Sequence, residues 1–251
     1  MTAAAPGAAL DTREQQPDQV TDPLARLLAA AGIAGVAVVI VLVGVLHLLP
    51  ETSAISPMIR TISEYALTDV GWVFNVGVLA LALGSLAVLA AIVRAGLARP
   101  ASIGVWLGVA WSAALTVIVL FPKHNWAVGP STNGQIHRAA SIVAFLCLPV
   151  AVLLLTRRRG APRRDQPVAV KVAWWFGALS LAWFTPIVVA LLLAPVTGTP
   201  WFRAIPLGLV ERGLVMCEVI AVLALGIWVL SATRRSRSPR PASPALTRPT
   251  A

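Results

Sequence analysis

Long runs of apolar residues alternate along the chain with short polar connections. Six of these runs reach the length of about 20 residues that an α-helix needs to cross the hydrocarbon core of a bilayer. The pattern therefore predicts an all-α, polytopic membrane protein built as a bundle of six transmembrane helices. The predicted spans are residues 27–49, 71–93, 103–121, 136–155, 172–193 and 208–230.

The composition agrees with a membrane location. Of the 251 residues, 58% are hydrophobic and 12% are charged, and the mean hydropathy is +0.82, more apolar surface than a soluble domain could bury in one core. The net charge of +10 does not change this interpretation, because the basic residues lie in short connections and tails and are not interleaved with aromatic residues. We expect membrane lipids as partners and no nucleic acid.

The segments before and after the predicted helices lack apolar periodicity. Residues 1–24 are rich in Pro, Gln, Asp, Thr and Ala, and they predict a disordered cytoplasmic tail. Residues 25–232 form the transmembrane domain. Residues 233–251, rich in Arg, Ser and Pro, predict a second disordered tail that is basic, cytoplasmic and attracted to anionic headgroups.

Lys and Arg residues predict the orientation, because they are retained on the cytoplasmic side of membrane proteins. With six helices both termini lie on one side. Fifteen basic residues share that side with the termini, whereas five lie on the other: Arg60, Lys123, Arg138, Arg203 and Arg212. The bias predicts a multi-pass protein of the cell membrane with both termini in the cytoplasm.

A stripe of small residues follows one face of the third predicted helix. Gly104, Gly108 and Ser112 recur at four-residue spacing, which lets another helix approach closely. Both a homo-oligomer contact and internal packing would use such a stripe. We favour internal packing, because six helices have many mutual contacts to make.

Glu218 is the most deeply placed ionisable residue in the predicted spans. It follows the start of the last helix, near Gly208, by ten residues, which corresponds to a depth of roughly 15 Å. A carboxyl group at that depth needs either a proton or a partner. Ser112, Ser180 and Thr185 are candidate partners. A proton or cation site, or a polar anchor for a ligand, is the functional alternative.

Further polar residues gather at the predicted outer face. Glu211 lies two helical turns before Glu218, so both carboxyl groups share one helix face, and Arg212 lies beside them. Such a Glu–Arg pair can also be an interfacial ion pair without further function. The candidate ligand-binding residues at or below this face are His47, Glu64, Tyr65, His137, Glu211, Arg212 and Glu218.

Known catalytic and metal-binding patterns are weak in this chain. Its three histidines, His47, His124 and His137, show no i, i+3 or i, i+4 pair, so we expect neither a metal nor a cofactor. A hydrolase could combine Ser63 or Ser141 with His137 and Glu64, but no GxSxG motif is present. The two cysteines, Cys147 and Cys217, lie in apolar segments and predict small buried residues.

Several short stretches resemble the bacterial membrane family called domain of unknown function 998. They are Thr61–Leu67 with Gly77 and Gly84-Ser85, then Phe121-Pro122 with Gly134 and Ile136-His137, and finally Gly208–Arg212. The resemblance implies six helices and no particular activity. The chain departs from the family pattern after Phe-Pro, where Lys123-His124 replaces an acidic residue.

Three functions fit these observations. The first is binding of a lipid headgroup or a small polar ligand at the outer polar cluster. The second is a membrane enzyme that acts on an outer-leaflet lipid with His137 and either Glu64 or Glu211 as acid and base. The third is a structural or assembly subunit. We favour binding over catalysis.

Overall fold

The computed structural model describes residues 22–125, 129–157 and 163–235. The predictions for the two tails therefore fall largely outside the described residues. The described residues form six helices that are long and apolar enough to cross a membrane, which confirms the predicted six-helix architecture. These are α1 (Pro23–Leu46), α2 (Gly71–Arg94), α3 (Ile103–Leu120), α4 (Thr132–Leu155), α5 (Val168–Thr197) and α6 (Leu207–Arg235). Short 3-10 turns are η1 (Pro50–Thr52), η2 (Ile62–Leu67), η3 (Arg163–Asp165) and η4 (Trp201–Arg203).

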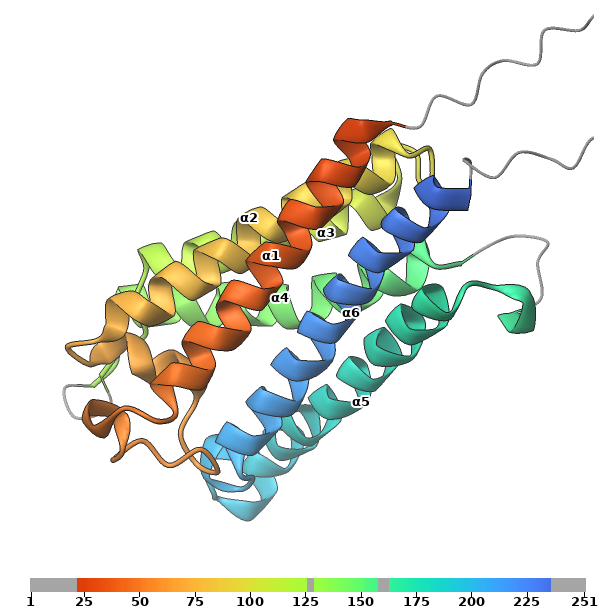
Figure 1. Ribbon diagram of the computed structural model, residues 1–251. Coiled ribbons are helices and arrows are strands. Elements are labelled where there is room, and N and C mark those ends of the chain that lie inside the picture. The colour runs from red at the N-terminus through yellow and green to blue at the C-terminus, as the bar shows by residue number, and fades with distance from the viewer. Residues whose placement is uncertain (1–21, 126–128, 158–162, 236–251) are drawn as a thin grey trace, which may run out of the picture.

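The helices form a bundle in which neighbours along the chain pack together. Helix α1 begins and α6 ends at the same end of the bundle (Figure 1). We call the opposite end, which carries the α1–α2, α3–α4 and α5–α6 connections, the distal end. Helices α2 and α6 are the most buried spans. Helix α5 is the least buried, and it packs mainly against α6 and α4.

Helix α1 begins at Pro23, four residues before the predicted start. Asp22 caps it, because its Oδ1 atom accepts hydrogen bonds from the backbone amides of Leu24 (3.0 Å) and Ala25 (3.1 Å). Its Oδ2 atom forms an ion pair with Arg94 Nη2 at 3.0 Å, which ties the start of α1 to the end of α2. The Ala25 amide and the Arg94 guanidinium hold the pKa of Asp22 below its usual value.

Helix α5 is longer at both ends than the predicted span 172–193, and it continues through Pro186. Proline has no N–H to donate to the carbonyl four residues earlier, which here belongs to Ala182. The Thr185 hydroxyl donates to that carbonyl instead, with 2.6 Å between Oγ1 and O. A side chain thus replaces the missing backbone donor, so the polar group is satisfied inside the apolar span.

Helix α4 begins at Thr132, a full turn before the predicted start at 136. The Ser131 hydroxyl oxygen accepts a hydrogen bond from the Gly134 amide at 3.1 Å and caps the helix. The start was missed because the first turn of α4 is polar, whereas the span was predicted from apolar residues.

Glycines bring α1 and α2 into backbone contact. A Cβ atom added to Gly35 would lie 2.5 Å from the Ala80 carbonyl oxygen, and one added to Gly32 would lie 2.6 Å from that of Gly84. Such close approach increases van der Waals contact, which drives helix association in lipid. Packing of α1 on α2 therefore depends on these two positions.

We predict that Gly35→Ala lowers the free energy of unfolding by roughly 1–3 kcal/mol, because the obstructing atoms belong to the rigid backbone of α2. Thermal unfolding of the purified protein in detergent measures the change. Gly44→Ala is the matched control, since no atom lies within 4 Å of its added Cβ. Equal effects of the two substitutions would contradict the packing argument.

Candidate functional site

The first half of the site is a backbone contact between the α1–α2 connection and the start of α6. The Leu209 amide donates to the Met58 carbonyl at 3.1 Å. Gly208 permits this approach, because a Cβ atom there would collide with the Arg60 carbonyl oxygen and lie 2.6 Å from that of Pro57. The connection is therefore held directly on the first turn of α6.

Arg212 reinforces this contact with its guanidinium group. Its Nη1 atom donates to the carbonyl oxygens of Pro57 (2.8 Å), Arg60 (2.7 Å) and Gly208 (3.0 Å). These distances are those of charge-assisted hydrogen bonds, which are stronger than neutral ones. One side chain thus satisfies carbonyl groups of two segments that are far apart in the sequence.

The other edge of the guanidinium contacts His47 and Tyr65. Arg212 Nε donates to His47 Nε2 at 3.0 Å, and His47 Nδ1 lies 2.7 Å from the Val43 carbonyl oxygen. Because arginine can only donate, the imidazole Nε2 accepts and the proton is on Nδ1, which donates to Val43. The Tyr65 hydroxyl lies 3.4 Å from Arg212 Nη2. This histidine is therefore held by structural contacts on both nitrogens.

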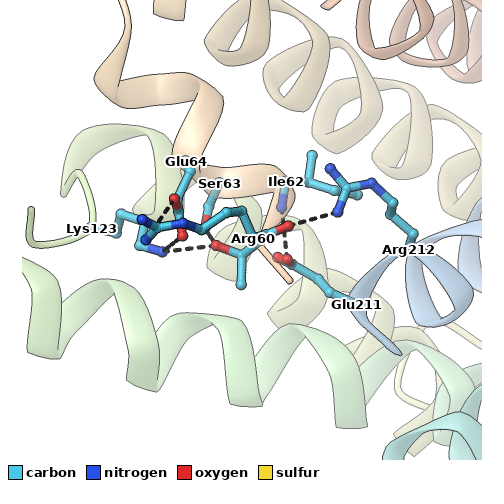
Figure 2. Close-up of polar contacts among 8 residues, drawn as sticks. Arg60, Ile62, Ser63, Glu64, Lys123, Glu211 and Arg212 are labelled. Carbon is cyan, nitrogen blue, oxygen red and sulfur yellow. Dashed lines mark hydrogen bonds and ion pairs between the residues drawn. The ribbon is translucent and has the colours of Figure 1, made fainter. Parts of the chain in front are cut away.

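Glu211 forms the next contact along α6. Its Oε2 atom accepts a hydrogen bond of 2.7 Å from the Ile62 amide, at the start of η2. A carboxylate suits this position, because the first N–H groups of a helical turn have no partner within it. We call the contacts of Gly208, Glu211 and Arg212 with the backbone of residues 57–62 the distal clasp. Figure 2 shows its contacts between Glu211 and Ile62 and between Arg212 and Arg60.

Glu64 lies on the other side of the same segment and pairs with Lys123 (Figure 2). Lys123 Nζ lies 3.2 Å from Glu64 Oε1 and donates to Thr61 Oγ1 at 2.8 Å. Arg60 Nη1 lies 3.4 Å from Glu64 Oε2. The Lys123 and Glu64 side chains are only 9% and 13% exposed, so their attraction is weakly screened by solvent. This pair joins the α1–α2 and α3–α4 connections.

A cavity of about 880 Å³ opens beside this ion pair. Cationic side chains from three different connections border it, together with one carboxylate and several apolar residues. Its lining consists of Ile59, Arg60, Thr61, Glu64, Lys123, Phe202, Arg203, Ala204, Ile205, Pro206 and Leu207. Mixed apolar walls with a few placed polar groups are typical of ligand sites.

His137 is buried outside this lining, below the end of α3. Its Nδ1 atom lies 2.9 Å from the Phe121 carbonyl oxygen and 3.2 Å from that of Ile118. These carbonyls belong to the last turn of α3, where no helical N–H remains to satisfy them. The imidazole therefore caps α3 from α4. His124 packs closely against Gly134, at the start of α4.

Glu218 is likewise distant from the cavity, buried at 4% exposure among the spans. Of its three predicted partners, Ser112 donates to the Gly108 carbonyl and Thr185 to that of Ala182. The third predicted partner, Ser180, does face the carboxyl group. The indole N–H of Trp111, which was not predicted as a partner, faces it too. Trp111 lies mid-span, where the sequence predicts packing between helices, with a stacking surface for a ligand as the minority alternative.

The structure thus divides the seven predicted site residues into separate groups. His47, Tyr65 and Arg212 lie together, Glu211 lies beside them in the clasp, and Glu64 alone lines the cavity. Four polar cavity residues were missed as site residues: Arg60, Thr61, Lys123 and Arg203. For Lys123, the sequence did hold a clue: it stands where the family resemblance implies an acidic residue. Among the described residues no group of three or more His, Cys, Asp or Glu could hold a metal ion.

The small-residue stripe of α3 lies within the bundle. A Cβ atom on Gly104 would meet Leu155, one on Gly108 would meet Leu89, and Ser112 is 1% exposed. These positions pack α3 against α4 and α2 of the same chain. Formation of a homo-oligomer stays a prediction, and the stripe, being internal, does not provide its contact surface.

These features define a membrane protein whose described residues include six helices long and apolar enough to cross a membrane, and charged side chains join its distal connections. The chain belongs to the family described as protein of unknown function (DUF998), whose model matches residues 33–228. No curated protein and no solved structure matches it.

Apart from Gly77 and Gly84-Ser85 in α2, the stretches that carry the family resemblance lie at the distal end. Ile62 and Glu211, from two of these stretches, share the 2.7 Å hydrogen bond of the clasp, and His137 caps the helix end at Phe121. The clasp accounts for residue types that otherwise suggest a catalytic or binding site.

We predict that Arg212→Met lowers the free energy of unfolding by about 2–4 kcal/mol, because several carbonyl groups lose a charged donor. Arg212→Lys should recover little of this loss, since one ammonium group cannot reproduce the planar set of N–H donors of a guanidinium group. Thermal unfolding and limited proteolysis of the α1–α2 connection are the measurements. Arg138→Met, at an exposed position near the start of α4, is the control. Full stability of Arg212→Met would show that the clasp is dispensable.

Proposed function

We propose that the distal cavity binds the anionic headgroup of a membrane amphiphile. The observation that carries the proposal is the charge of the lining: Arg60, Lys123 and Arg203 border the cavity with Glu64 as the one carboxylate. A net charge of +2 next to apolar walls favours a phosphate or carboxylate group attached to an acyl or isoprenoid chain.

Arg203 is the residue most available to a ligand. Glu64 is shared between Arg60 and Lys123, whereas in the described part of the chain no carboxylate lies within ion-pair distance of Arg203. Its guanidinium carbon lies over the Phe202 ring, 5.9 Å from the ring centroid. A planar guanidinium in this position can bind phosphate or carboxylate through two parallel hydrogen bonds.

The apolar part of the lining favours an amphiphile over a free anion. Phe202, Ile205 and Leu207 border the cavity on the α5–α6 side, and Ile59 on the other is 66% exposed. A small inorganic anion would make no use of these side chains. The alkyl chain of a lipid would cover them and gain by leaving water.

The setting that we propose is the plasma membrane of a bacterium, with both termini in the cytoplasm and the cavity at the outer face. The support is the excess of Lys and Arg on the side of the termini.

Neither alternative function has a specific observation in its favour. An acid–base pair of His137 with Glu64 or Glu211 would need these groups at one cavity, yet His137 and Glu211 bond to backbone groups elsewhere. An assembly role would need an exposed contact surface, and the stripe on α3 is internal.

We predict that dioctanoyl phosphatidic acid binds to the purified protein in neutral detergent and that Arg203→Gln weakens this binding at least tenfold. Loss of one charge-assisted contact, worth roughly 1.5–3 kcal/mol, accounts for such a change. Isothermal titration calorimetry gives the affinity. Arg138→Gln, also an exposed arginine near the distal end, should bind like the wild type.

Two further ligands distinguish the contribution of the anionic headgroup to binding from that of the acyl chains. Dioctanoyl phosphatidylcholine should bind more weakly than the anionic lipid, and inorganic phosphate more weakly still. Equal affinity for inorganic phosphate would contradict the role of the apolar walls. Unchanged affinity of Arg203→Gln would contradict the cavity as the site.

We also predict that a green fluorescent protein fused to the C-terminus fluoresces in a bacterial host, whereas alkaline phosphatase at the same place is inactive. The first reporter is active only in the cytoplasm and the second only outside it, so together they show on which side of the membrane the C-terminus lies. Fusions within the α5–α6 connection, after Gly198, should give the opposite result. Active phosphatase at the C-terminus would overturn the proposed orientation.

A further inference from the structure

Three buried polar atoms without hydrogen-bond partners lie between α3, α5 and α6. They are Trp111 Nε1, Ser180 Oγ and Glu218 Oε1, and their residues are 1%, 0% and 4% exposed. The indole N–H and the hydroxyl face the carboxyl group, but none of the three atoms makes a hydrogen bond of acceptable geometry in the described part of the chain. Unpaired polar groups inside a bilayer protein are costly, so three that face one another call for a shared partner.

Ser180 differs from the other buried serines of the spans. Ser85 and Ser112 each donate to the carbonyl oxygen four residues earlier, at 2.6 Å and 3.1 Å. That bond within the helix is the usual solution for a serine in an apolar span. The Ser180 hydroxyl does not use it and is left available toward Glu218.

The chemistry of the three groups limits what can bind between them. The Trp111 indole can only donate, which disfavours a cation at this point. The Ser180 hydroxyl can donate or accept, and Glu218 Oε1 can accept. One neutral oxygen that accepts from the indole, donates to Glu218 Oε1 and either donates to or accepts from the Ser180 hydroxyl would satisfy all three atoms.

We propose that Trp111, Ser180 and Glu218 form an intramembrane site for one neutral hydroxyl-type oxygen, supplied by a water molecule or by an alcohol from the lipid phase. A single oxygen is sufficient, because each of the three atoms needs only one hydrogen-bond partner.

Such a bridge would fasten α5 to the bundle. Helix α5 is the least buried span, and apolar contact provides little drive for association in lipid, which is itself apolar. A bound oxygen would connect Ser180 of α5 to Trp111 of α3 and Glu218 of α6. This site is separate from the distal cavity, so either proposal can fail without the other.

The direct test is a density map of the wild-type protein that resolves water molecules, from lipidic-phase crystals or from electron microscopy with a bound antibody fragment. We expect one peak at about 2.7–3.2 Å from each of the three atoms. Direct hydrogen bonds among the three side chains, with no peak between them, would overturn the proposal.

A double-mutant cycle in thermal unfolding provides a second test. Ser180→Ala and Glu218→Gln should each lower Tm by at least about 2–4 °C, and the double variant should lose clearly less than the sum, because both residues hold one oxygen. Ser112→Ala with Glu218→Gln is the matched control and should be additive, since the Ser112 hydroxyl bonds within its own helix. Additive losses for Ser180 and Glu218 would overturn the proposal.

Added solutes then identify the source of the oxygen. A rise in the Tm of the wild type with 1-decanol, absent in Ser180→Ala, would support a lipid-phase alcohol. A density peak without such a rise would support water. A rise with sodium, potassium or magnesium chloride that Glu218→Gln abolishes would show a cation site and overturn the proposal.

Discussion

The distal end depends on the guanidinium group of Arg212, which donates to backbone carbonyls of the α1–α2 connection and of α6. The α1–α2 connection has carbonyl groups that neither helix nor sheet satisfies, and here a charged side chain is the donor to two of them. Because the same connection carries Thr61 and Glu64, it also sets where Lys123 finds its partners. The shape of the cavity therefore follows from contacts at the clasp, although Arg212 does not line it.

Much of the fold could be predicted from the sequence because apolar length is a direct physical requirement of the bilayer. All six spans follow from it, and the errors occur at helix ends where polar residues act as caps, as at Asp22 and Ser131. The predicted span 172–193 already continues through Pro186, and the length of α5 was missed at its two ends, where the helix begins at Val168 and runs past Pro195 to Thr197. Pro186 does not end the helix, because Thr185 satisfies the carbonyl that the proline leaves free.

The site was harder to predict, because the type of a residue and its depth in the membrane do not specify which way its side chain points. His137 and Glu211 lie at the predicted face, yet each bonds to the backbone of a neighbouring segment. Such side chains resemble catalytic residues in a sequence, because a cap and a general base use the same atoms. Arg203 gave no signal of its own, since its importance comes from the absence of a nearby carboxylate among the described residues.

The identity of residue 123 decides the charge of the cavity. With Lys123 present, Glu64 is neutralised and the lining has a net charge of +2. An acidic residue there would remove one cation and add one carboxylate, so that the lining would be neutral overall. Glu64 would then face a like charge, and Arg60 would be its remaining partner. The proposed anion binding therefore depends on Lys123 of this chain, whereas the clasp depends on Gly208, Glu211 and Arg212, which belong to the stretches that resemble the family.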